Sequence, residues 1–101
     1  MAKVTVIATM RAQAGKEAAL QDFLTRLVGH TRAEAGCVDY DLHRQQDDPS
    51  VFVMYENWTD KSELDKHLQM PYMVEFANAL PDLLRSPLEL QLLDMLSTPR
   101  G

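Results

Sequence analysis

The order of strand-like and helix-like segments is the feature of this 101-residue chain that most restricts its fold. Strands are indicated by short stretches that are rich in β-branched residues or alternate in polarity, and helices by apolar residues repeated every three or four positions. Strand-like segments occupy residues 3–10, 37–45, 51–58 and 88–96, and helix-like segments occupy residues 16–35, 60–69 and 72–80. The order is β-α-β-β-α-β with a helical insertion after the second helix. This order predicts an α+β, ferredoxin-like fold, in which a four-stranded antiparallel sheet carries its helices on one face.

The overall composition restricts the environment and the partners of the chain. The length favours a single domain over residues 1–101, with an ordered core at about residues 3–96. Fifteen acidic and ten basic residues give a net charge of −5 without a cluster of Lys and Arg, which disfavours nucleic acid and anionic membrane surfaces as partners. The apolar runs are too short for a membrane span, no signal-peptide pattern is visible, and a single cysteine excludes an internal disulfide. We therefore expect a cytoplasmic protein.

Two of the strand-like segments are apolar on both faces. In residues 51–58, Met54 falls on one face and Val53 on the other, and residues 3–10 show the same property. Helices in this fold cover one face of the sheet, so the second apolar face would be exposed in a monomer. Burying a Val or Leu side chain contributes roughly 1.5–3 kcal/mol, and large exposed apolar patches are uncommon in monomers. We therefore predict a symmetric homodimer formed sheet against sheet.

The segment at residues 37–45 leaves a monomeric alternative open. Its side chains alternate strictly between apolar and polar. The apolar face would carry Val38, Tyr40 and Leu42. The polar face would carry Asp39, Asp41 and His43. If this polar face is the solvent face of the sheet, no second copy is needed to cover it.

Three residues near the middle of the chain could face one dry cavity. Glu56 and Trp58 are two positions apart, so they point to the same side of their strand. His67 lies three positions after Leu64, on the apolar side of its helix. Burial raises the pKa of a carboxyl group, and a carboxylate beside an imidazole could share a proton with it and abstract one from a phenol or an acidic C–H group. Each residue also has a structural interpretation, in which Glu56 pairs with an arginine, His67 bonds a backbone carbonyl, and Trp58 fills the core.

The helical insertion supplies further candidates for the walls of such a cavity. Tyr72 and Phe76 could roof it and exclude water, although ordinary core packing is the simpler explanation of both. Tyr40 is open to the same two interpretations, and Met54 shares the strand face of Glu56. The absence of CxxC, HExxH and clustered Cys and His residues predicts that the chain has no metal site.

Two motifs in the chain resemble those of a known family. Residues 34–40, EAGCVDY, are similar to an E-x-G-C-x-x-Y junction between helix and strand, and residues 52–58, FVMYENW, followed by His67, are similar to an E-x-W…H segment. Both are motifs of the antibiotic biosynthesis monooxygenase (ABM) family, part of the dimeric α/β-barrel superfamily, and the resemblance extends over about residues 3–96. It implies a ferredoxin-like protomer, sheet-to-sheet dimerisation and a pocket between sheet and helices. In the better-known members it also implies oxygenation of quinols or polyphenols without metal or flavin.

The resemblance also implies roles for the candidate residues. His67 would be the base that deprotonates a quinol, and Glu56 would be its partner. No cofactor would be needed, because the substrate supplies the electrons that reduce O₂. The side chains expected to contact the substrate are Trp58, Tyr72, Phe76, Tyr40, Met54 and Arg44. We therefore expect a monooxygenase whose partners are a small molecule, O₂ and a second copy of the chain.

Two alternatives stay open within this resemblance. One branch of the family isomerises a phosphorylated signal and keeps a similar glutamate and histidine, and its phosphate would need cations at the pocket mouth. The candidate cations are Arg44, Arg11 and Lys66. The other alternative is a non-catalytic ligand-binding dimer, in which His67 and Glu56 are packing residues. A haem-degrading branch is disfavoured, because the first strand lacks the Asn of that branch and His67 falls near the position of its Trp.

Overall fold

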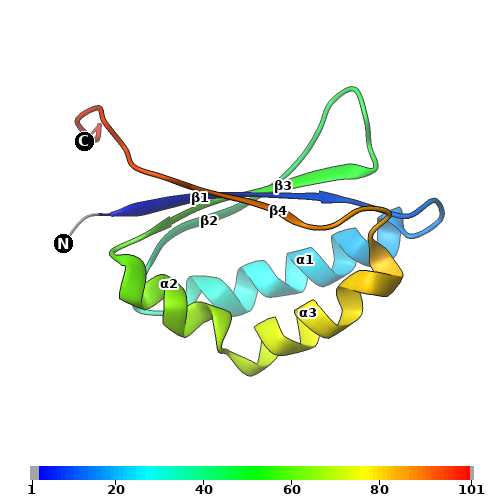
Figure 1. The fold of residues 1–101 in the computed structure, drawn as a ribbon, viewed down its shortest axis with the longest axis horizontal. Helices are drawn as coiled ribbons and strands as arrows, with labels where there is room; N and C mark the ends of the chain where they lie inside the picture. Colours follow the sequence, from blue (N-terminus) through cyan, green and yellow to red (C-terminus); the bar gives the residue numbers. More distant parts are fainter. Residues whose placement is uncertain (1–2, 101) are drawn as a thin grey trace.

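The structure follows the predicted order of strands and helices (Figure 1). It is a computed structural model that describes residues 3–100, so Met1, Ala2 and Gly101 of the predicted domain lie outside the described residues. The elements are β1 (Val4–Arg11), α1 (Glu17–Arg32), β2 (Cys37–Arg44), β3 (Val51–Trp58), α2 (Lys61–Leu68), α3 (Pro71–Leu83) and β4 (Glu89–Leu93). The strands form one sheet in the order β2-β3-β1-β4, and every neighbouring pair is antiparallel. The predicted α+β, ferredoxin-like fold is therefore confirmed.

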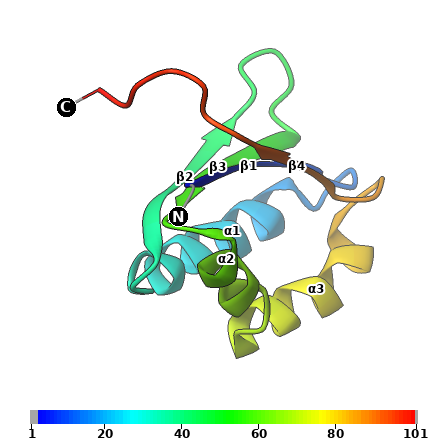
Figure 2. The same ribbon diagram turned by 60° about the vertical axis from the view of Figure 1, so that its left-hand side comes forward.

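The core lies between the sheet and the helices, which cover one of its faces (Figures 1 and 2). From α1, the buried side chains are Leu20, Leu24, Leu27 and Thr31, spaced by three and four positions. From the two central strands, the buried side chains on this face are Val6, Ala8, Met10, Phe52, Met54, Glu56 and Trp58. Among the described residues, no helix is long and apolar enough to cross a membrane.

The second strand departs from the strict alternation of its sequence. Cys37 and Asp39 pair with consecutive residues of β3, so β2 carries a bulge at Val38. Val38 is 50% exposed, whereas Tyr40 is buried against the helices. The predicted apolar face of β2 is therefore wrong at Val38, because the extra residue shifts the alternation at that point.

The helical insertion continues further than its sequence pattern predicts. Its expected end was Leu80, before Pro81, but α3 extends to Leu83. Proline lacks the N–H that a helix interior needs, and this usually ends or bends a helix. Here the last turn of α3 is stabilised by the loop after β1, because the side-chain amide of Gln13 donates to the carbonyl oxygens of Pro81 and Leu84 at 3.1 Å each. The N–H of Leu84 also bonds the carbonyl oxygen of Leu80 at 2.9 Å.

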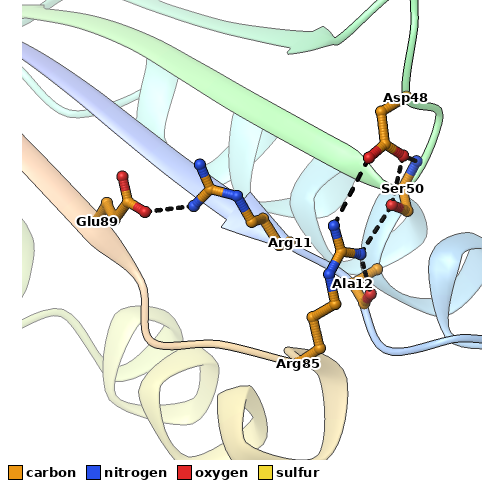
Figure 3. A network of polar contacts seen from close by, with 6 residues as sticks. All are labelled: Arg11, Ala12, Asp48, Ser50, Arg85 and Glu89. Carbon is orange, nitrogen blue, oxygen red and sulfur yellow. Dashed lines mark hydrogen bonds and ion pairs between the residues drawn. The ribbon is translucent and has the colours of Figure 1, made fainter.

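Two arginines tie one end of the sheet to the segment that leads into β4 (Figure 3). The guanidinium of Arg85 donates to the carbonyl oxygen of Ala12 at 2.8 Å and lies 3.6 Å from the Asp48 carboxylate. Arg11 of β1 pairs with Glu89 of β4. These contacts hold the start of β4 beside the end of β1, and β4 forms one wall of the space between sheet and helices.

Candidate functional site

A cavity of about 110 Å³ lies between the helices and the sheet. Its walls are mainly apolar and come from α1, α2, α3 and every strand of the sheet. The polar side chains that line it are Tyr40, Glu56, Lys61, Asp65 and His67. Leu68, Leu90 and Leu92 also line it and are 48%, 49% and 49% exposed. The cavity therefore opens between α2 and β4, the edge strand of the sheet.

The position of α2, which carries His67, is set by its N-terminus. The side chain of Asp60 accepts a hydrogen bond from the backbone N–H of Glu63 at 3.0 Å, and this caps the helix. The carbonyl oxygen of Gly36 accepts from the N–H of Thr59 at 3.0 Å. A Cβ atom on Gly36 would lie 2.4 Å from the Cβ of Glu63, so the glycine is required for this close approach. Its φ is not positive, so the glycine serves packing here and not a left-handed turn.

His67 is the most enclosed polar side chain of the cavity wall, at 1% exposed. Its Nδ1 atom lies 2.8 Å from the Oε2 atom of Glu34. Its ring centroid is 4.6 Å from that of Trp58 and 5.5 Å from that of Tyr40, which approaches edge-on. The imidazole is thereby held on three sides, with one ring nitrogen engaged by a carboxylate.

Glu34 is a functional candidate that sequence reasoning missed, since it entered only as a letter of a motif. It lies between α1 and β2, and its side chain is 8% exposed. The hydroxyl of Tyr72, in the first turn of α3, donates to the same Oε2 atom that contacts His67. The sequence signal for Glu34 is its place as the first residue of the E-x-G-C-x-x-Y motif, whereas its contact with His67, 33 positions away, is visible only in the structure.

Glu56 lies on the sheet side of the cavity and is 5% exposed. The indole Nε1–H of Trp58 donates to its Oε1 atom at 3.0 Å. Burial raises the pKa of Glu56 from 4.5 to about 7. The hydrogen bond from Trp58 lowers this pKa, and the negative charge of Glu34 raises it by a smaller amount. The hydrogen-bond partner of His67 is thus Glu34, whereas Glu56 bonds Trp58 and is partly protonated near neutral pH.

The imidazole of His67 and the phenols of Tyr40 and Tyr72 are neutral near pH 7. Burial lowers the pKa of His67, and the hydrogen bond and charge of Glu34 oppose this effect without cancelling it. Burial, followed by the nearby charge of Glu56, raises the pKa of Tyr40. Burial, followed by the Glu34 hydrogen bond, raises the pKa of Tyr72. The site therefore offers a neutral imidazole as a proton acceptor and two phenols that keep their protons.

The predicted substrate contacts divide into three groups by position. Tyr40, Met54 and Phe76 line the cavity beside Glu56 and His67. Trp58 and Tyr72 are not among the lining residues. They lie behind the cavity wall, bonded to Glu56 and Glu34. Arg44 lies in a separate groove of about 500 Å³ at the end of β2. Within residues 3–100, no three His, Cys, Asp or Glu side chains gather into a cluster that could hold a metal ion.

Comparison with known protein families identifies the family to which the chain belongs. The model of the family described as antibiotic biosynthesis monooxygenase matches residues 3–79. The chain belongs to the ABM family. The resemblance predicted from the two motifs is thereby confirmed, and the match includes His67 and both glutamates of the site.

This ABM chain is similar to proteins from several bacteria. It is 30% identical over 90 residues to "Putative monooxygenase Rv0793" of Mycobacterium tuberculosis, covering 89% of this chain and 88% of that protein. The structure of Rv0793 matches with a TM-score of 0.92 at 28% identity, over 97% of this chain and 99% of that chain. The crystal structure of PA3566 from Pseudomonas aeruginosa matches with a TM-score of 0.90 at 35% identity, over 96% and 97% of the two chains. An uncharacterized protein of Synechocystis, sll1783, is 34% identical over 68 residues, which are 67% of this chain and 46% of that protein. The chain thus spans less than half the length of this last relative.

Proposed function

We propose that this ABM protein is a monooxygenase that oxidises a small, electron-rich aromatic substrate, such as a hydroquinone, with O₂ and without a bound cofactor. Family membership and the names of the relatives support a monooxygenase-like function. The observation that supports this substrate class is the neutral, buried imidazole of His67 in a mainly apolar cavity. Such a cavity favours an uncharged ring, and such an imidazole can accept the proton of a phenolic hydroxyl.

The proposed reaction balances without an external reductant. His67 takes the proton of one hydroxyl, the anion transfers an electron to O₂, and the two radicals combine at a ring carbon that carries hydrogen. Loss of water from the resulting hydroperoxide leaves a hydroxyquinone. One oxygen atom of O₂ enters the ring, and the other leaves as water with the two hydrogens that the substrate loses. Glu56, whose pKa is raised to about 7, is the candidate donor of the proton that the departing hydroxide needs.

The size of the cavity supports a substrate with one ring inside it. An apolar cavity of about 150 Å³ is known to accept benzene. The cavity here is about 110 Å³, so a single six-membered ring fills it and leaves part of the molecule at the opening. A fused second ring would have to project between α2 and β4, where Leu68, Leu90 and Leu92 provide an apolar rim.

The charges around the cavity favour a neutral ligand over a phosphorylated one. Arg11 pairs with Glu89 and Lys66 with Glu63, and among the described residues neither lines the cavity. The cation that does line it, Lys61, is bonded to Asp65 at 2.9 Å. A phosphate group would therefore meet the Glu56 and Asp65 carboxyls without an unpaired cation to compensate them.

Oxygen uptake tests the proposal directly. Purified protein, treated with a chelator and free of flavin absorbance, is mixed with hydroquinone, methylhydroquinone and 1,4-naphthohydroquinone, and the spontaneous oxidation rate is subtracted. We expect uptake of one O₂ per quinol and a loss of about 10²–10⁴-fold in kcat/KM for His67→Ala, the usual contribution of a positioned base. His43→Ala is the matched control, because His43 is an exposed histidine of β2 on the face of the sheet away from the cavity; once sedimentation shows its oligomeric state unchanged, its rate should equal that of the wild type.

The outcomes separate the three functional classes. Turnover of a substrate under strictly anaerobic conditions would contradict the monooxygenase and favour a proton-transfer isomerase. Binding of these quinols without O₂ uptake, unchanged by His67→Ala, would favour a ligand-binding protein.

We also propose that the protein works as a homodimer formed through the uncovered face of the sheet. This face carries Ile7, Val53, Tyr55 and Leu93, and Tyr55 and Leu93 are 38% and 45% exposed. The charged residues of this face lie at its margins, with Asp39 and Asp41 on the edge strand β2 and the paired Arg11 and Glu89 at one end of β1 and β4, so apolar side chains occupy its centre. A second copy would bury this surface, as the sequence pattern suggested.

Sedimentation velocity tests the dimer with two matched substitutions. Val53→Glu, on the uncovered face, should shift the protein to monomer, whereas Val74→Glu, on the outer side of α3, should leave the dimer intact. A wild-type protein that sediments as a monomer at micromolar concentration would refute the proposal.

A further inference from the structure

One buried carboxylate, that of Glu34, receives two polar groups on the same oxygen atom. Oε2 contacts Nδ1 of His67 at 2.8 Å and the hydroxyl of Tyr72. The side chains of Glu34 and His67 are 8% and 1% exposed, and within the described part of the chain no Lys or Arg pairs with Glu34. A buried carboxylate without a cation needs hydrogen-bond donors to compensate its charge. His67 and Tyr72 are the two groups that can supply them.

The donors and acceptors of this trio determine where its hydrogens lie. The hydroxyl of Tyr72 keeps its proton, because burial and the neighbouring Glu34 raise its pKa, and it therefore donates to Oε2. A carboxylate oxygen accepts hydrogen bonds, so a neutral His67 must carry its hydrogen on Nδ1. We propose that Glu34 and Tyr72 are positioning residues that hold His67 in the tautomer with hydrogen on Nδ1, so that the Nε2 lone pair is free to face the cavity. The arrangement also fixes the plane of the ring, which packs between Trp58 and Tyr40.

This tautomer suits His67 to accept a proton from a ligand. The proton of a ligand hydroxyl moves to Nε2, the Nδ1–H bond stays intact, and the charge of Glu34 stabilises the imidazolium that forms. The use of His67 as a base rests on the proposed function, whereas the tautomer does not. The titratable groups that face His67 from the packed elements are Glu34 before β2, Tyr40 of β2, Glu56 of β3 and Tyr72 of α3.

Substitution of the two positioning residues should change the titration of His67 in opposite directions. Glu34→Gln removes the negative charge, and the midpoint of His67 should fall by about one to two pH units, the equivalent of a charge-assisted hydrogen bond. Tyr72→Phe removes a competing donor from Oε2, so the remaining bond to His67 strengthens and the midpoint should rise. A merely structural Tyr72 would leave the midpoint unchanged.

Nitrogen NMR of protein labelled with ¹⁵N-histidine reads both the tautomer and the midpoint. The chain has three histidines, and spectra of His30→Ala and His43→Ala assign the His67 signals. We expect a protonated-type shift at Nδ1 and an unprotonated-type shift at Nε2 in the wild type. Glu34→Ala should lose this preference. The matched controls are Glu75→Gln and Tyr55→Phe, which make the same chemical changes at exposed positions and should leave both tautomer and midpoint unchanged.

Two results would overturn the inference. One is a hydrogen on Nε2 of His67 in the wild type, and the other is an unchanged tautomer and midpoint in both Glu34→Ala and Tyr72→Phe. Should the Glu34 variants fail to fold, Tyr72→Phe carries the test by itself, because it removes one oxygen atom and keeps the ring. A wild type that has the Nδ1–H tautomer but takes up no O₂ with any quinol would contradict the proposed function and leave this inference standing.

Discussion

Replacing Glu56 by Gln should stabilise the protein at high pH and leave its stability almost unchanged at low pH. Glu56 is 5% exposed, and burial moves its pKa from 4.5 to about 7. A carboxyl group with a higher pKa in the folded state binds more protons there than in the unfolded state. The free energy of unfolding therefore falls as the pH rises from about 4.5 to about 7. Glutamine has the shape of the protonated acid, and its oxygen can still accept the Nε1–H of Trp58.

The size of this effect follows from the two pKa values. One pH unit corresponds to about 1.4 kcal/mol, so a pKa raised from 4.5 to about 7 costs the wild type about 3 kcal/mol above pH 7. The variant does not carry this cost. The difference in unfolding free energy between Glu56→Gln and wild type should therefore grow by about 3 kcal/mol between pH 4 and pH 8.

Urea unfolding at half-unit pH intervals measures this difference. Far-UV circular dichroism should be followed together with the fluorescence of Trp58, since the indole is bonded to residue 56 and its signal could change locally. The protein concentration must be the same in all samples, because a dimer gains stability with concentration. Other carboxyl groups titrate in both proteins and cancel in the difference. Two stability curves that stay parallel from pH 4 to pH 8 would show that Glu56 titrates normally and would refute the reasoning.

Two further predictions concern residues beside the site. Gly36→Ala should destabilise the protein by about 1–3 kcal/mol in urea unfolding, because the new Cβ would meet the Cβ of Glu63. Gly29→Ala, with open space around it on α1, should stabilise the protein by about 0.5–1 kcal/mol. Equal effects of the two substitutions would contradict the close approach of Gly36 to Glu63. Burial raises the pKa of Cys37 from 9.0 to about 11, so its reaction with iodoacetamide at pH 8, followed by mass spectrometry, should be about 100-fold slower than that of an unperturbed thiol. A rate close to that of a cysteine peptide would contradict the raised pKa of Cys37.

The fold could be predicted from the sequence because the residue pattern within each element and the order of the elements indicate the same arrangement. Apolar spacing in α1 and β-branched residues in β1 and β3 specify the elements, and their order leaves few arrangements of the sheet. The shared strand side of Glu56 and Trp58 follows from a spacing of two residues. The structure places Trp58 against His67 and Glu56 on the wall of the same cavity, because α2 packs on that side of the sheet.

The missed features depend on contacts between distant segments. Glu34 is 33 positions from His67, and the two meet only when the junction before β2 packs against α2. Pro81 stays within α3 because Gln13, from the loop after β1, bonds its carbonyl oxygen. The bulge at Val38 is a property of pairing between two strands, and the residue pattern of one strand does not reveal it.

The contact between a substrate hydroxyl and His67 is the central claim, and a crystal structure with resorcinol tests it most directly. Resorcinol is the 1,3-isomer of hydroquinone, with the same ring and two hydroxyls, and crystals soaked and frozen without O₂ keep it unreacted. The account predicts that its ring occupies the cavity under Phe76, with one hydroxyl within hydrogen-bond distance of Nε2 of His67. Resorcinol bound in the groove beside Arg44, or in the cavity without a contact to His67, would contradict it.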